Sequence, residues 1–172
     1  MEFENTGIPV LSEIYSSLFG SFVHAFRNAV DHGIETPNER VKNGKPEAGH
    51  IKVSFSLIKD HGHQNLRIVV KDDGAGVDPE KIRARLAQKN IDTSRESDSQ
   101  VIQHLFDSQF STKEQVTETS GRGVGMDAIK IAAEELDGHA WVESEKGKGT
   151  SLFVEVPYYQ TLPEIKKYGT AA

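Results

Sequence analysis

The sequence predicts an α+β two-layer sandwich, in which helices cover one face of a mixed, mostly antiparallel sheet. Two observations support this fold class. Periodic segments occur in the order helix, helix, strand, strand, helix, helix, loop, helix, strand, strand, which is neither alternating strand–helix nor all strand. The chain has 172 residues, of which 36% are hydrophobic, enough for one domain with a sizeable core. We expect this domain over residues 1–158 and a loosely held tail over 159–172.

The first two predicted elements are helices. Apolar residues recur at intervals of three and four over residues 10–32, which predicts a long core helix. We expect Gly33 to end this helix in a left-handed cap. Thr36 and Pro37 then suit the N-cap and first position of a short helix that runs to residue 41.

Two pairs of strands follow from alternating hydrophobicity. Residues 51–57 and 66–70 alternate apolar and polar side chains, and the polar segment 60–65 between them predicts a turn. We therefore expect an antiparallel pair. Near the end of the chain, residues 140–144 and 150–156 predict a second pair joined by a glycine-rich turn.

The segment between the strand pairs predicts helices and one long loop. A helix is expected over 78–89, because Asp-Pro-Glu at its start suits an N-cap, a first position and an acidic first turn. A short helix should follow over 98–106. Residues 107–121 lack periodicity and predict a long mobile loop, which in a compact domain is functional or disordered. Residues 126–136 then form a helical stripe.

Composition excludes several classes of function. Lys and Arg total 20 against 26 Asp and Glu, and a net charge of −6 disfavours binding to nucleic acid or anionic lipid. No apolar stretch approaches the length that spans a bilayer, and the first residues do not resemble a secretory signal, so we expect neither membrane insertion nor export. The absence of Cys excludes thiolate catalysis and fits a cytoplasmic location.

One face of the first helix carries an unusual set of polar side chains, His24, Asn28, Asp31 and His32. Each of them alone is typical of a solvated helix edge. Together they could line a pocket in which Asn28 offers an oxygen to a hard cation and His24 offers a titratable nitrogen.

Glycine-rich segments provide further candidates. Residues 72–76, Asp-Asp-Gly-Ala-Gly, end a strand; this is either a turn with two solvated acids or a site where a flat ligand meets a buried carboxylate. Residues 121–125 precede a helix, whose free N–H groups and dipole favour a phosphate, although Gly there also suits a flexible cap. They match neither a Rossmann fingerprint nor a P-loop. Residues 147–150 alone suggest only a hairpin turn.

The order of these segments resembles the ATP-binding domain of CheA-type chemotaxis histidine kinases, roughly over residues 11–157. The boxes that resemble it are 24–35 for the N box, 72–76 for G1, Phe106 with 110–116 for F, 121–127 for G2 and 147–150 for the last G box. The resemblance implies the Bergerat (GHKL, histidine kinase-like ATPase) fold with a mobile ATP lid. It also implies transfer of the γ-phosphate of Mg-ATP to a histidine on a separate phosphoacceptor domain.

The resemblance assigns roles residue by residue. Asn28 would coordinate Mg²⁺, Asp72 would accept the adenine amino group, and His24 would help to deprotonate or orient the acceptor imidazole, with Asn28 as the second catalytic residue. Gly74 and Gly76 would lie near the base, supported through water by Thr150. Further ATP-binding residues implied are Asp31, His32, Ser111, Lys113, Gly121, Arg122, Gly123, Val124 and Gly125.

The implied partners are a phosphoacceptor histidine domain, a downstream two-component response regulator, and a receptor and coupling protein reached through other domains. One departure leaves an alternative open: Ser108-Gln109 stand where the family has Pro-Gly at the lid hinge, which keeps a regulatory module that binds ATP without transfer under consideration. A small metal site from His24, Asp31 and His32 with His61 and His63 is another alternative. A serine kinase or ATP-hydrolysing switch of the same fold would need a carboxylate at His24.

Overall fold

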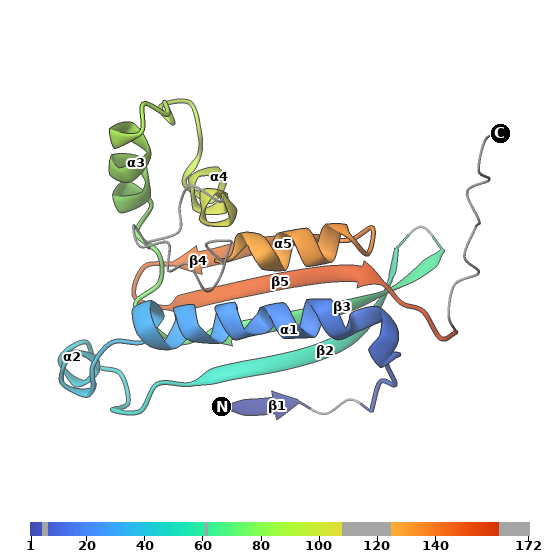
Figure 1. Cartoon of the computed structure of the whole chain (residues 1–172). Helices are drawn as coiled ribbons and strands as arrows, with labels where there is room; N and C mark the ends of the chain where they lie inside the picture. Colours follow the sequence, from blue (N-terminus) through green and yellow to red (C-terminus); the bar gives the residue numbers. More distant parts are fainter. Residues whose placement is uncertain (5–6, 61, 108–124, 162–172) are drawn as a thin grey trace, which may run out of the picture.

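A computed structural model describes residues 1–4, 7–60, 62–107 and 125–161 (Figure 1). Its sheet has the strand order β1-β2-β3-β5-β4. Strand β1 pairs with β2 in parallel, and the other neighbours are antiparallel. The strands are β1 Glu2–Glu4, β2 Ile51–Asp60, β3 His63–Asp72, β4 His139–Glu145 and β5 Gly149–Pro157.

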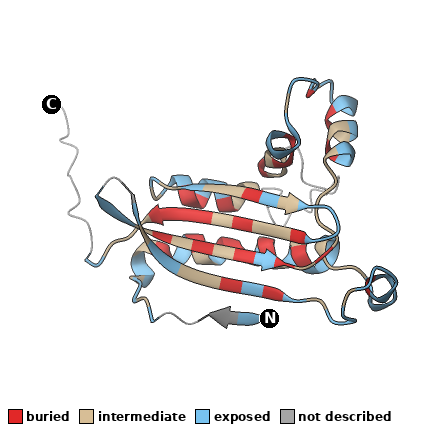
Figure 2. Cartoon of the chain, turned by 180° about the vertical axis from the view of Figure 1, so that it is seen from behind, coloured by how far each residue is buried: buried red, intermediate tan, exposed pale blue. Residues whose placement is uncertain are grey.

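Helices α1 and α5 cover one face of this sheet (Figure 1). In the described part of the chain the other face has no covering helix (Figure 2), which confirms the predicted two-layer α+β fold. Helix α4 packs beside the edge strand β4. The helices are α1 Ser12–Asn28, α2 Pro37–Lys42, α3 Pro79–Gln88, α4 Asp98–Gln103 and α5 Asp127–Glu134, with a π turn η1 Ala29–Gly33 and a 3₁₀ turn η2 His104–Phe106.

The core lies between the helices and the sheet. Alternate residues of β3 and β5 face the helices, because successive side chains of a strand point to opposite faces. The residues buried there include Leu66, Ile68 and Val70 of β3, Leu152, Val154 and Val156 of β5, and Leu18, Phe22 and Ala25 of α1. Among the described residues no helix is both long and apolar enough to cross a membrane.

The first strand pair is longer than the sequence predicted. Its pairing register continues to Asp60 and His63, so the expected six-residue polar turn is mostly strand. Gly62, with φ of 87°, lies inside the remaining tight turn. Strand β1 was not predicted, because three residues carry too little periodicity to signal a strand.

The end of the first helix also differs from expectation. Gly33 is not left-handed; the helix widens instead into η1, where the N–H of Ile34 donates to the carbonyl of Ala29 at 2.8 Å. A Cβ at Gly33 would lie 3.6 Å from both carboxylate oxygens of Asp72. The π turn therefore brings the end of the first helix against the end of β3.

Candidate functional site

A cavity of about 580 Å³ opens where the end of α1 meets the ends of β3 and β5. The turn η2 and the start of α5 complete its lining. Its apolar lining consists of Ala25, Ala29, Val70, Val77, Leu105, Met126, Val142 and Leu152. A cavity of this size with apolar walls and a few polar groups suits a small organic ligand.

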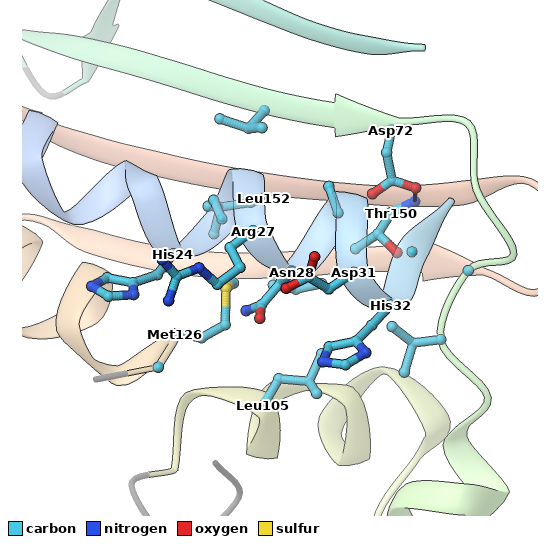
Figure 3. A pocket seen from close by; sticks show the side chains of 18 of the residues that line it. His24, Arg27, Asn28, Asp31, His32, Asp72, Leu105, Met126, Thr150 and Leu152 are labelled. Atoms are coloured by element: carbon cyan, nitrogen blue, oxygen red, sulfur yellow. Dashed lines mark hydrogen bonds between the residues drawn. The ribbon is translucent and has the colours of Figure 1, made fainter. Parts of the chain in front are cut away.

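The polar side chains lie in sequence along this cavity. Figure 3 shows Asp72 and Thr150 at one end, Asn28 in the middle, and His24 with Arg27 at the other end. The order follows from the helix: positions four residues apart lie one turn apart on the same face. Of the residues predicted from the sequence, those that line the cavity are His24, Asn28, Asp31, His32, Asp72, Gly76, Gly125 and Thr150.

The remaining predicted residues are not in the lining. Gly74 does not line the cavity; a Cβ there would lie 2.1 Å from the carbonyl oxygen of Gly33. Glycine is therefore needed at Gly74 for contact between two backbone turns. Ser111, Lys113, Gly121, Arg122, Gly123 and Val124 lie outside the described residues, as does the hinge Ser108-Gln109.

Asp72 is a buried, oriented acceptor at one end of the cavity. The residue is only 7% exposed. Its Oδ1 accepts hydrogen bonds from the N–H groups of Gly74 at 2.9 Å and Thr150 at 3.2 Å. Burial raises the pKa of Asp72, and these two hydrogen bonds oppose the rise. No described residue hydrogen-bonds to Oδ2, so this oxygen can accept a hydrogen bond from a ligand.

His24 lies at the opposite end. Burial lowers the pKa of its imidazole, the neighbouring Arg27 lowers it further, and Asp127 opposes both. The lowered pKa favours the neutral ring at pH 7, in which one nitrogen can accept a proton.

Asn28, between the two ends, has no hydrogen-bond partner for its side chain among the described residues. Its amide oxygen is the kind of ligand that Mg²⁺ accepts together with phosphate oxygens. Within the described residues no group of three or more His, Asp or Glu side chains could hold a metal ion, which gives no support to the alternative site of His24, Asp31 and His32; His61 lies outside the described residues. Figure 3 shows the reason: His24 and His32 lie on opposite sides of Asn28.

Comparison with known proteins identifies the family. Residues 19–160 match the family described as histidine kinase-, DNA gyrase B- and HSP90-like ATPases. The chain belongs to this family of ATPases. Membership supports ATP binding by a domain of the kinase class, and the resemblance to CheA-type kinases is confirmed.

Several relatives are similar over most of this chain. The chemotaxis protein CheA of Klebsiella aerogenes is 44% identical over 78% of the chain, and that of Borreliella burgdorferi is 40% identical over 91%. A gliding motility regulatory protein of Myxococcus xanthus is 36% identical over 94% of the chain. The chain spans 18–21% of the length of these three curated relatives.

A solved structure supports the ATPase fold. The histidine kinase domain of the Erythrobacter litoralis EL346 blue-light activated histidine kinase matches with a TM-score of 0.52. The match covers 91% of this chain and 50% of that chain at 13% identity, so the likeness is one of fold.

Sequence reasoning missed three charged residues that line this cavity, Arg27, Asp107 and Asp127. The described lining contains four carboxylates but only one Lys or Arg side chain, that of Arg27; the acids are Asp31, Asp72, Asp107 and Asp127. Asp127 Oδ1 accepts the N–H groups of Gly125 and Ala128 at 2.9 and 3.0 Å, so the Gly125 donor expected to meet phosphate is already bonded. An acid in the first turn of a helix is the signal that could have found Asp127. The acidic side chains of the described lining attract cations.

Proposed function

We propose that the chain is the catalytic domain of a CheA-like protein histidine kinase. In this proposal it binds Mg-ATP and transfers the γ-phosphate to a histidine on a separate phosphoacceptor domain. The observation that carries it is the order of Asp72, Asn28 and His24 along one cavity. ATP bound with its amino group at Asp72 directs its triphosphate past Asn28 toward His24.

In phosphoryl transfer the protein itself forms no covalent bond with the phosphoryl group. Transfer forms a bond between an acceptor imidazole nitrogen and the γ-phosphorus and breaks the bond to the β–γ bridging oxygen, whose electron pair leaves with ADP. Mg²⁺, when bound, would neutralise charge on the phosphates, and Asn28 is the residue that would hold it. The neutral ring of His24 can accept a hydrogen bond from the acceptor imidazole and take up its proton.

The partners follow from the same proposal. The relatives include chemotaxis proteins CheA and a gliding motility regulatory protein, and this chain spans about a fifth of each. We infer that the acceptor histidine belongs to another domain, that a response regulator takes the phosphate onward, and that a receptor and coupling protein act through further domains. ATP binding without transfer is a second candidate, and it rests on Ser108-Gln109 in place of the Pro-Gly that the family has at the lid hinge.

Calorimetric titration tests this function. The purified chain is titrated with ATP and with GTP, each with and without Mg²⁺, alongside D72A, N28A and the control D92A. Asp92 accepts the N–H of Ser94 and does not line the cavity. We expect adenine-selective binding that D72A abolishes, Mg²⁺ dependence that N28A removes, and D92A behaving as the wild type.

A second step separates transfer from regulation. A phosphoacceptor domain and labelled ATP are added, and H24Q should lose labelling while still binding ATP. Binding without any labelling would favour the regulatory module. If neither nucleotide binds at roughly millimolar concentration, the proposed function is wrong.

A further inference from the structure

The segment between the first helix and β2 meets the turn after β3 in a cluster of charges that does not line the cavity. Its members, which we call the clamp cluster, are Glu35, Arg40, Lys45, His50 and Asp73. The Arg40 residue is only 1% exposed, although arginine is almost never buried without partners. Such a buried charge needs a structural or functional reason.

Arg40 joins helix α2 to the turn that follows β3. Its Nη2 lies 2.9 Å from Asp73 Oδ2, and its Nη1 donates to the Asp73 carbonyl and to Glu35 Oε2, each at 3.2 Å. Its Nε donates to the carbonyl of Pro46 at 2.8 Å. The two neighbouring acids of this turn therefore have different roles: Asp72 lines the cavity, while Asp73 belongs to the clamp cluster.

Lys45 holds the same turn by its backbone. Its Nζ donates to Glu35 Oε1 at 2.7 Å, to the Asp73 carbonyl at 3.0 Å and to the Gly74 carbonyl at 2.6 Å. An ammonium group has three donors, and each has an acceptor here. Burial opposes ionisation of Glu35, but the hydrogen bond from Lys45 and the nearby Arg40 charge lower its pKa, which favours the charged carboxylate.

Gly74 links this clamp to the cavity. Its carbonyl accepts from Lys45, and its N–H donates to Asp72 Oδ1 at 2.9 Å. Next to it, the N–H of Ala75 donates to the Gly33 carbonyl at 2.8 Å. The position of the Asp72 carboxylate therefore depends on a turn in which Lys45 binds the Gly74 carbonyl and shares the Asp73 carbonyl with Arg40.

We propose that Lys45 is a positioning residue for base recognition, which acts through the Asp73 and Gly74 carbonyls to hold Asp72 in place for a purine with a 6-amino group. The proposal rests on the proposed function. Lys45 does not line the cavity, so it acts without touching the nucleotide. Loss of the Lys45 ammonium group should weaken the binding of ATP more than that of GTP. ATP offers an amino donor at position 6 of the base, and GTP does not.

The test compares nucleotide affinities of Lys45 variants in the purified chain. For K45M we expect the Kd for Mg-ATP to rise about tenfold and the Kd for Mg-GTP, measured by displacement, to stay within about twofold. K45R keeps a cation and should lie between K45M and the wild type. K146M is the matched control: Lys146 binds Asp78 at 2.8 Å beside the same turn but does not hold its carbonyls, so its affinities should not change.

Each outcome decides the question. If the ratio of the ATP and GTP affinities is the same in K45M as in the wild type, whether both affinities fall or neither does, the positioning role is overturned. If K45M does not fold, E35Q removes the charge that faces Lys45 and should shift the same ratio in the same direction; an unchanged ratio in E35Q then overturns the proposal. A wild-type chain that does not prefer ATP over GTP contradicts the proposed function itself and is recognised before any variant is compared.

Discussion

The side-chain amide of Gln103 pairs with both backbone groups of Val142, as a neighbouring strand would. Gln103 Nε2 donates to the Val142 carbonyl at 2.8 Å, and the Val142 N–H donates to Gln103 Oε1 at 3.1 Å. Val142 lies in β4, the edge strand of the sheet, and lines the cavity. The end of α4 is thereby fixed to the cavity wall, and one unpaired segment of the edge is covered.

Replacing this amide should destabilise the domain. For Q103A we expect a loss of about 1–2 kcal/mol, because two hydrogen bonds to partly buried backbone groups disappear. Urea denaturation measures the change in the free energy of unfolding. Q103E keeps the acceptor but not the donor, so its stability should lie between those of Q103A and the wild type. Q88A, at the exposed end of α3, serves as a control expected within about 0.5 kcal/mol of the wild type. Equal stabilities for Q103A and Q88A would contradict the pairing.

The rate of phosphotransfer should fall at low pH because His24 becomes protonated. Burial and then Arg27 hold its pKa below 6.5, so the ring is neutral above that pH and protonates only as the pH falls further. We expect the transfer rate at saturating ATP to fall with decreasing pH at a midpoint below 6.5. R27Q removes a positive neighbour, so its midpoint should move to higher pH. If the midpoint is the same in R27Q and the wild type, the fall in transfer rate is caused by the protonation of another group.

Much of the fold follows from local patterns. Alternating apolar side chains at 51–57 and 66–70 predicted the antiparallel strand pair, and Asp78 caps α3 by accepting the N–H of Glu80. The π turn and β1 were missed for a physical reason. A single widened turn leaves no periodic signature, and three residues pair with β2 only because the folded sheet offers them an edge.

The site divides in the same way. The resemblance identified Asp72, Asn28 and His24, and the fold brings them into one cavity. The clamp of Arg40 and Lys45 on the Asp72 turn could not be predicted, because each cation lies in an ordinary polar segment. Its partners are distant in sequence: Arg40 and Asp73 are 33 residues apart.

His104 should make stability depend on pH. Its Nδ1 lies 2.6 Å from Asp107 Oδ2 and its Nε2 lies 2.9 Å from Glu96 Oε2. Burial lowers the pKa of this ring, but the hydrogen bonds to Asp107 and Glu96 outweigh burial and raise it above 6.5. Because the folded-state pKa exceeds the unfolded value, the stabilisation is complete below pH 6.5 and is lost as the pH rises through the folded value.

Two variants measure this linkage. The free energy of unfolding from urea titrations at about pH 6 and pH 8 should fall more for the wild type than for H104Q, which cannot titrate. H139Q is the control, since His139 is exposed and 3.7 Å from its nearest carboxylate. The same pH slope in H104Q and the wild type would exclude His104 as the source.

Gly76 should not tolerate a side chain. It has φ of 68°, and a Cβ there would lie 2.2 Å from the Glu145 carbonyl oxygen. G76A should therefore lower the free energy of unfolding by more than the roughly 1–2 kcal/mol expected for a left-handed non-glycine residue alone. It should also weaken ATP binding, because the turn must shift. G147A is the matched control: φ is 83°, but no atom lies within 4 Å of the added Cβ. Equal thermal stabilities for the two variants would show that the contact with Glu145 is not limiting.

Tyr15 ties the segment after β5 to the first helix. The residue is 0% exposed, and its Oη donates to the Pro157 carbonyl at 2.7 Å and accepts the N–H of Tyr159 at 2.9 Å. Y15F should lower the free energy of unfolding by about 1–2 kcal/mol, because both backbone groups lose a partner in a part-buried place. Y158F, which removes one exposed bond to the Pro9 carbonyl, should cost less. Urea denaturation compares the two, and an equal cost would mean that water replaces the Tyr15 hydroxyl as readily as the exposed one.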